Sequence, residues 1–188
     1  MDKLPLITLA AGVAAAESIQ LLCGMEIMLK WPNDLYLDGR KLGGILTETS
    51  PLQVDAMPTF VVVGMGINVN SSCDDFPSEL RNRVTSLYCL THRKHDLDAM
   101  LELIMKGLLE NVTLLRRESE ELLQRWRARD MLLGKRIRWD DPRGRELTGT
   151  GQGLLDDGRY RLTTDEGREY SVLAGDITLR EIDGRTVK

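Results

Sequence analysis

An Asp-Gly dipeptide at residues 38–39 separates two short runs that alternate in polarity, and it indicates where this chain could carry out chemistry. Asp-Gly in that setting is typical of a tight β-hairpin turn. With this turn, Tyr36 faces Lys41 and Asp34 faces Gly43, and all four share one face because side chains alternate along strands. Lys41 and Asp34 are then diagonal neighbours, about 7–8 Å apart before their side chains extend. A cation, a carboxylate and a glycine gap suit a small anionic ligand, although a solvent-facing lysine beside a turn is also commonplace.

A second glycine-containing segment follows the β-branched run at 59–66, which we predict to be a buried central strand. Gly64 and Gly66 would let a ligand approach the backbone closely. Asn68, just beyond them, can both donate and accept a hydrogen bond, as a purine edge requires. The third glycine of a dinucleotide fingerprint is absent, so the pattern does not indicate a Rossmann site.

The sequence pattern changes near residue 131. Before it, apolar residues at helical spacing predict helices at 8–22, 96–112 and 118–129, with Asp96 as an N-cap, alongside the strands of the hairpin. After it, turn signals recur every eight to twelve residues, as in a small closed barrel. The five strand candidates there are 135–139, 146–155, 159–163, 168–173 and 177–181. We therefore predict an α+β fold: a mixed, largely antiparallel sheet packed by helices in residues 1–131, then a β-barrel in residues 132–188.

Composition argues against several classes of partner. The formal net charge of −4 is a poor basis for gripping a nucleic-acid backbone, and we interpret the arginines of residues 116–129, which alternate with glutamates, as a solvated helix face. No run approaches the roughly 18 apolar residues of a membrane span. The three cysteines, without a C-x-x-C pair, predict free thiols in a reducing cytoplasm and no metal site. His92 and His95 lack further ligands nearby in sequence.

Two segments of the chain resemble a known family. Lys30-Trp31-Pro32-Asn33-Asp34-Leu35-Tyr36, followed by residues 39–48, resembles the signature of biotin protein ligases, the biotin–[acetyl-CoA-carboxylase] ligases. Residues 63–70 resemble that family's second block, and residues 154–180 its C-terminal barrel. The resemblance implies a class II synthetase-like core, incomplete in this chain, followed by a small SH3-like barrel.

The resemblance also implies a two-step reaction. Biotin and ATP with Mg²⁺ give biotinyl-5′-AMP and pyrophosphate, and a lysine of biotin carboxyl carrier protein then attacks the mixed anhydride. By motif position, Lys41 contacts the biotin carboxylate and adenylate phosphate, and Asp34 receives the incoming lysine. Lys30 packs along the adenine, and Asn68 hydrogen-bonds that base. The other implied binding residues are Asn33 beside the nucleotide, Gly43, Gly44 and Gly64 in the backbone lining, and Asp176 and Arg180 from the barrel.

One part of the family pattern is missing from these 188 residues. The Gly-Arg-Gly-Arg-x-Gly-Arg-x-Trp loop would close over biotin and the phosphates with charge-assisted hydrogen bonds worth roughly 1.5–3 kcal/mol each. We therefore expect little or no ligase activity from this chain alone, and self-association through exposed sheet edges. A truncated product, half of a split ligase and a non-catalytic biotin- or carrier-binding remnant all remain open. A lipoate-type ligase shares the core fold but is disfavoured, because the Lys-Trp-Pro-Asn-Asp block belongs to the biotin branch.

Overall fold

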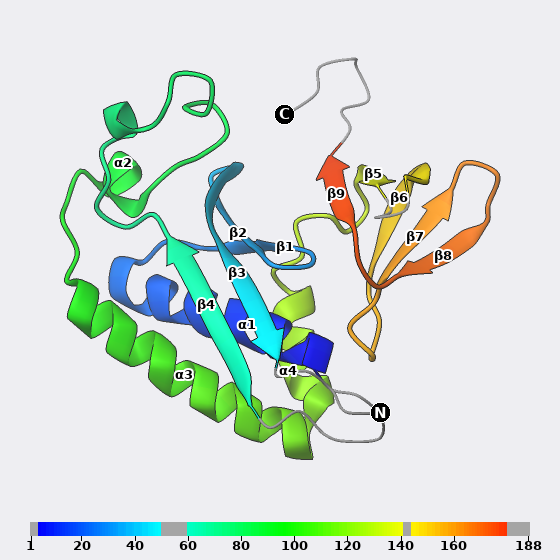
Figure 1. Ribbon diagram of the computed structural model, residues 1–188, viewed down its shortest axis with the longest axis horizontal. Helices are drawn as coiled ribbons and strands as arrows, with labels where there is room; N and C mark the ends of the chain where they lie inside the picture. Colours follow the sequence, from blue (N-terminus) through cyan, green and yellow to red (C-terminus); the bar gives the residue numbers. More distant parts are fainter. Residues whose placement is uncertain (1–3, 50–59, 141–143, 180–188) are drawn as a thin grey trace.

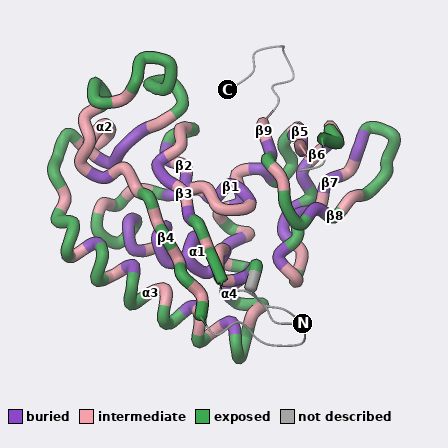
Figure 2. The backbone as a smooth tube through the Cα atoms, viewed as in Figure 1, coloured by how far each residue is buried: buried purple, intermediate pink, exposed green. Residues whose placement is uncertain are grey.

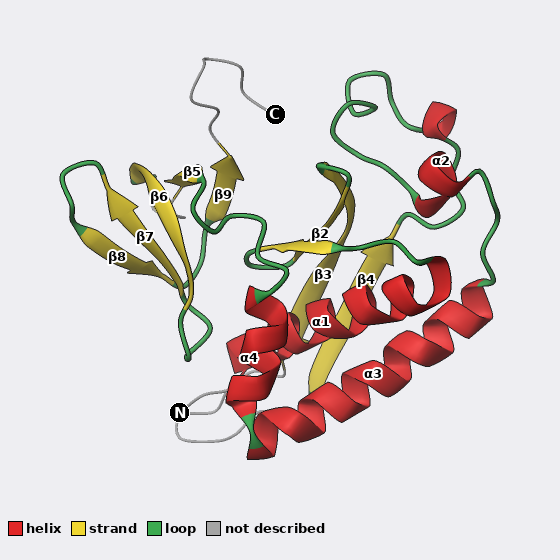
Figure 3. Ribbon diagram, turned by 180° about the vertical axis from the view of Figure 1, so that it is seen from behind, coloured by secondary structure: helices red, strands yellow, loops and turns green. Residues whose placement is uncertain are grey.

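The computed structural model describes residues 4–49, 60–140 and 144–179, and its elements form two units (Figure 1). The first unit has a four-stranded antiparallel sheet in the order β1-β2-β3-β4. Helices α1, α3 and α4 lie together on one side of that sheet (Figure 3). The elements are α1 (Leu4–Cys23), β1 (Met28–Lys30), β2 (Asp34–Leu37), β3 (Arg40–Thr49), β4 (Val61–Ile67), the short 3₁₀ helix η1 (Cys73–Asp75), α2 (Leu87–Thr91), α3 (Leu97–Arg117) and α4 (Ser119–Arg127).

The second unit is an antiparallel sheet of five strands, close to the five predicted. They are β5 (Arg136–Asp140), β6 (Glu146–Leu154), β7 (Tyr160–Thr164), β8 (Glu169–Val172) and β9 (Asp176–Leu179), in the order β8-β7-β6-β5-β9. The α+β class is therefore confirmed. Among the described residues β8 does not pair with β9, so closure of this sheet into a barrel stays a prediction. The domain boundary near residue 131 also stays a prediction.

Helix α1 forms the centre of the core (Figure 2). It contacts the sheet on one side and α3 and α4 on others, which explains why nearly its whole circumference is apolar. By length and composition alone it could cross a membrane, which corrects the expectation that no such run exists; most of it is buried inside the protein, as in the core helix of a folded domain. Gly107 of α3 passes close to it, since a Cβ there would lie 3.4 Å from the Ala14 Cβ.

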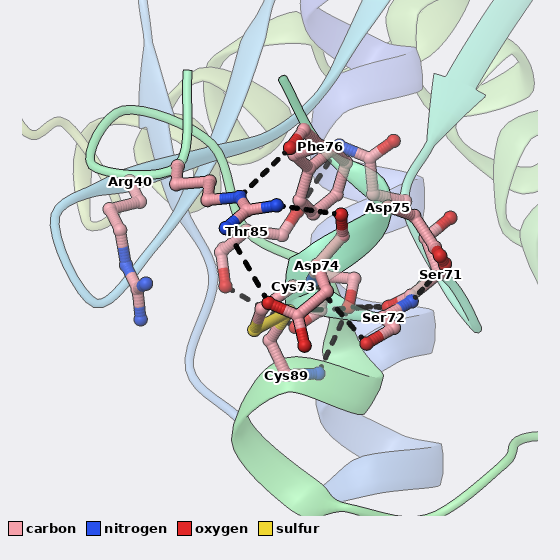
Figure 4. The surroundings of a disulfide bond; sticks show 12 residues. Arg40, Ser71, Ser72, Cys73, Asp74, Asp75, Phe76, Thr85 and Cys89 are labelled. Atoms are coloured by element: carbon pink, nitrogen blue, oxygen red, sulfur yellow. Dashed lines mark hydrogen bonds and ion pairs between the residues drawn. A yellow bond between two sulfur atoms is a disulfide. The ribbon is translucent and has the colours of Figure 1, made fainter. Parts of the chain in front are cut away.

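The segment between β4 and α3 corrects the expectation of three free thiols. Cys73 and Cys89 form a disulfide (Figure 4), with Cα atoms 5.5 Å apart, while Cys23 is free. Ser86 links the segments that carry the two cysteines: its hydroxyl donates to the Ser71 carbonyl at 2.7 Å and accepts from the Cys89 N–H at 2.9 Å. The two cysteines are 16 residues apart in sequence and come together only when the loop folds, so their spacing did not predict the disulfide.

Candidate active site

The β2–β3 hairpin turns at residues 38–39 as predicted, but its register differs by one residue. Tyr36 pairs with Lys41, whereas Asp34 pairs with Gly44, because a bulge lies between the two pairs. The predicted pairing of Asp34 with Gly43 is therefore wrong. The cause is tertiary: the Lys41 N–H donates to the Arg83 carbonyl at 2.8 Å, and the Lys41 carbonyl accepts from the Thr85 N–H at 2.9 Å, so an outside segment pairs with this part of β3.

The predicted meeting of a cation and a carboxylate on one face is confirmed. Lys41 Nζ lies 2.5 Å from Asp34 Oδ1. A second ammonium, Lys30 Nζ, lies 3.7 Å from Asp34 Oδ2 and 3.5 Å from Asp176 Oδ1 of the second unit. Lys30 and Asp34 are largely buried, but the Lys41 side chain is 43% exposed. Burial strengthens these attractions, and the exposed ammonium is the one that a ligand can reach.

Tyr36 completes this charged cluster from the middle of β2. Lys30 Nζ lies 5.9 Å from the centroid of its ring, within cation–π range. Burial, followed by the negative charges of Asp34 and Asp176, raises the pKa of Tyr36 to about 12. The phenol therefore stays protonated near neutral pH and can donate a hydrogen bond.

An open pocket of about 400 Å³ lies beside the Asp34–Lys41 pair. Glycine at position 44 keeps its floor open, since a Cβ there would lie 3.3 Å from Asp34 Oδ1 and 3.7 Å from Lys41 Nζ. Five of the predicted residues line the pocket: Asn33, Asp34, Lys41, Gly44 and Gly64. Gly66, where the sequence indicates close approach of a ligand to the backbone, also lines the pocket. The sequence did not indicate the other lining residues, Ile45, Leu46 and Met65. They come together through the pairing of β3 with β4, which no local motif reveals.

The remaining predicted residues lie in other places. A Cβ on Gly43 would lie 2.3 Å from the Gly66 carbonyl oxygen, so this glycine allows close strand approach and is not part of the lining. The Asn68 amide donates to the Thr85 carbonyl at 3.1 Å, also away from the lining. Asp176 contacts the cluster through its ion pair with Lys30. Arg180 lies outside the described residues.

Comparison with known proteins gives a consistent result. Residues 2–68 match the profile of the biotin/lipoate A/B protein ligase family. The biotin–[acetyl-CoA-carboxylase] ligase of Mycobacterium tuberculosis is 34% identical over 174 residues, covering 91% of this chain and 61% of the relative. The bifunctional ligase/repressor BirA of Bacillus spizizenii is 32% identical over 187 residues, covering 95% of this chain and 54% of the relative. This chain thus spans less than two thirds of these relatives' length.

The fold comparison extends across both units. The biotin protein ligase from Aquifex aeolicus, solved in complex with biotin and ATP, superposes with a TM-score of 0.80 at 29% identity. The match covers 96% of this chain and 73% of that one. Because the profile, the relatives and the solved structure agree, the chain belongs to the biotin protein ligase family.

Proposed function

We propose that this chain carries catalytic residues of a biotin–[acetyl-CoA-carboxylase] ligase, which activates biotin with ATP and transfers it to biotin carboxyl carrier protein. The names of the relatives and the ligands of the Aquifex aeolicus structure support this reaction. The observation that carries the proposal is the Lys41–Asp34 pair, which lies over Gly44 at the edge of an open pocket. That pair combines an exposed cation with a buried carboxylate, and each step of the reaction needs one of them.

In the first step, a carboxylate oxygen of biotin attacks the α-phosphorus of ATP, and pyrophosphate leaves. Negative charge then accumulates on the oxygens shared by the carboxylate and the phosphate. The exposed ammonium of Lys41 can donate hydrogen bonds to those oxygens, and such preorganised donors stabilise a transition state where charge develops. Lys30, held between Asp34 and Asp176, is proposed to lie along the nucleotide.

In the second step, the amine of the acceptor lysine attacks the carbonyl carbon of the mixed anhydride, and AMP leaves. The amine must lose a proton as its new bond forms. Asp34 is proposed to accept a hydrogen bond from that amine, to orient it and, as the general base, to take up the proton. Its two oxygens already interact with Lys41 and Lys30, so its position is fixed before the acceptor arrives.

The other residues are proposed as binding groups. Gly44 and Gly64 line the pocket, and Asn33 has its amide anchored on the Ile45 carbonyl at 2.7 Å. We propose that Gly43, Asn68, Asp176 and Arg180 bind biotin or the nucleotide, as the family resemblance implies. Among the described residues no three His, Cys, Asp or Glu side chains gather as a metal-binding group, so we assign Mg²⁺ to the phosphates of ATP, as part of the substrate.

The calorimetric test compares the wild-type chain with Lys41→Ala, titrated with biotin and ATP together. We expect the dissociation constant to rise by about tenfold to a hundredfold, because one charge-assisted hydrogen bond is lost. Lys106→Ala, on the exposed face of α3 and outside the pocket lining, is the matched control and should bind as wild type. Equal affinity of the wild type and Lys41→Ala would contradict the role of Lys41.

A transfer assay separates the proposal from its alternatives. Labelled biotin is incubated with ATP, apo carrier protein and the chain, and incorporation into the carrier is measured. We expect weak, ATP-dependent incorporation, because the Gly/Arg-rich loop is not among these residues. Binding of biotin or carrier with no transfer would favour the non-catalytic remnant. The composition and the family resemblance also support three further proposals: a cytoplasmic location, self-association of the chain, and the lack of nucleic-acid or membrane partners.

A further inference from the structure

A buried carboxylate outside the pocket has no role in the reaction proposed above. Asp130 is 9% exposed and lies just after α4, where the chain passes from the first unit to the second. Its Oδ1 accepts from the Leu132 N–H and its Oδ2 from the Tyr160 hydroxyl, each at 2.9 Å. Among the described residues it forms no ion pair. Because a buried carboxylate is costly unless its surroundings fix it, its position points to a specific task.

The side chain that Asp130 holds leads back to the candidate site. Tyr160, at the start of β7, is fully buried, and its ring centroid lies 6.0 Å from that of Trp31. The Trp31 indole N–H also donates to the Gly158 carbonyl at 3.0 Å. Trp31 is therefore held by a hydrogen bond from its indole to the turn between β6 and β7 and by a ring contact with the start of β7. Trp31 directly follows Lys30, one of the two lysines of the charged cluster.

The backbone around Asp130 holds the residue on the other side of Lys30. The Leu29 N–H donates to the Arg129 carbonyl at 2.7 Å, and the Leu29 carbonyl accepts from the Met131 N–H at 3.0 Å. Asp130 thus forms a parallel bridge with Leu29. We call these contacts between the two units the joint. The joint fixes the residues on both sides of Lys30, and the Lys30 ammonium extends toward Asp34 and Asp176.

We infer that Asp130, acting through Tyr160 and Trp31, is a positioning residue that fixes Lys30 between the two units at the nucleotide side of the candidate site. The inference rests on the proposed function, in which Lys30 lies along the nucleotide. It adds that the second unit also acts on nucleotide binding indirectly, through its contacts with Trp31 next to Lys30. The alternative is that the Asp130–Tyr160 bond only stabilises the fold.

A double-mutant cycle separates these two roles. Tyr160→Phe removes the hydroxyl but keeps the ring, and Lys30→Met removes the ammonium but keeps the length of the side chain. The dissociation constant for ATP in the presence of biotin is measured by calorimetry, well below each variant's melting temperature. We expect each single change to weaken binding by about fivefold to tenfold, and the double variant to bind no more weakly than Lys30→Met. Unchanged affinity in Tyr160→Phe, or additive losses in the double variant, would overturn the inference. Tyr170→Phe, in neighbouring β8, is the matched control and should bind as wild type.

A second measurement decides the inference even if the chain binds no ATP. A zero-length carbodiimide joins an ammonium to a carboxylate in contact with it, and peptide mapping quantifies each product. We expect the Lys30–Asp176 product in the wild type and a several-fold lower yield in Tyr160→Phe. The Lys41–Asp34 product is the internal control, because this pair forms within the β2–β3 hairpin, and its yield should not change. Equal Lys30–Asp176 yields would refute the positioning role, whereas a lack of ATP binding with the expected yields would refute only the proposed function.

Discussion

Two adjacent glycines of β3 show how the same residue type serves different purposes. Gly44 lies under the charged pair, and a Cβ there would be 3.3 Å from Asp34 Oδ1, close enough that the carboxylate must shift. We predict that Gly44→Ala weakens binding of biotin and ATP, measured by calorimetry, while the free energy of unfolding changes by less than about 1 kcal/mol. Its backbone conformation is ordinary, so alanine itself adds no strain.

Gly43→Ala is the matched comparison for this prediction. A Cβ there would lie 2.3 Å from the Gly66 carbonyl oxygen, and no flexible side chain can move to make room. We expect it to lower the free energy of unfolding by about 1–3 kcal/mol in urea titrations, because β3 and β4 must separate. If the two variants lose stability equally, Gly44 does not have the local role assigned to it.

At the residue scale, the sequence was sufficient to predict which charged residues meet, but not to predict how the two strands pair. The turn at residues 38–39 and strand alternation were enough to place Asp34 and Lys41 on one face. They were not enough to identify Gly44 as the partner of Asp34, because the bulge depends on hydrogen bonds from Lys41 to residues more than 40 positions away. Local propensity contains no information about such contacts.

At the scale of elements, α3 begins where its cap predicts. The Asp96 side chain accepts hydrogen bonds from the Asp98 N–H at 2.9 Å and the Ala99 N–H at 3.1 Å. We predict that Asp96→Ala lowers the free energy of unfolding by about 1 kcal/mol, because two helix N–H groups lose their acceptor. Asp98→Ala, which removes a first-turn charge without removing a cap, should cost only a few tenths of a kcal/mol. Urea titrations at one pH check both, and equal losses would argue against capping as the cause.

The interpretation of the arginines of residues 116–129 as a solvated helix face is wrong for the last three of them, Arg125, Arg127 and Arg129. Arg125 pairs with Glu17 of α1, and Arg127 donates to the Leu154 carbonyl at 3.0 Å. Arg129 donates to the Gln20 side chain at 2.6 Å and the Ile27 carbonyl at 3.2 Å. Alternation with glutamate made local pairing plausible, but these partners come from other elements, so the helix pattern could not reveal them.

At the scale of the whole molecule, the sequence indicates the five strands after residue 131, but it does not indicate the joint, the set of contacts between the two units. Turn signals at regular spacing were sufficient to locate five strands. The joint consists of single contacts between distant residues, among them Trp31 with Gly158, Asp130 with Tyr160 and Lys30 with Asp176. Each pair is more than 25 residues apart in sequence. None of these residues forms a motif with its partner, and only folding brings them together.

The joint should make the stability of the molecule depend on pH. Burial, partly offset by hydrogen bonds from Leu132 and Tyr160, raises the pKa of Asp130 from 3.8 to about 6. The folded state therefore binds this proton more tightly than the unfolded state does. The stabilisation is complete below about pH 4 and is lost as pH rises through 6, by about 3 kcal/mol in total.

Asp130→Asn removes this titration while it keeps the shape of the side chain. Free energies of unfolding are measured in urea from pH 4 to pH 7.5 for both proteins, because other carboxylates also titrate and only the difference isolates Asp130. We predict that the stability of the wild type relative to the variant falls by up to about 3 kcal/mol across this range. Tyr160→Phe removes a hydrogen bond that lowers the pKa of Asp130, so its decline should extend to higher pH. If the free energies of unfolding of all three proteins change in parallel with pH, the pKa of Asp130 is the same in the folded and unfolded states. That result would contradict the burial and hydrogen bonding of Asp130 in the joint.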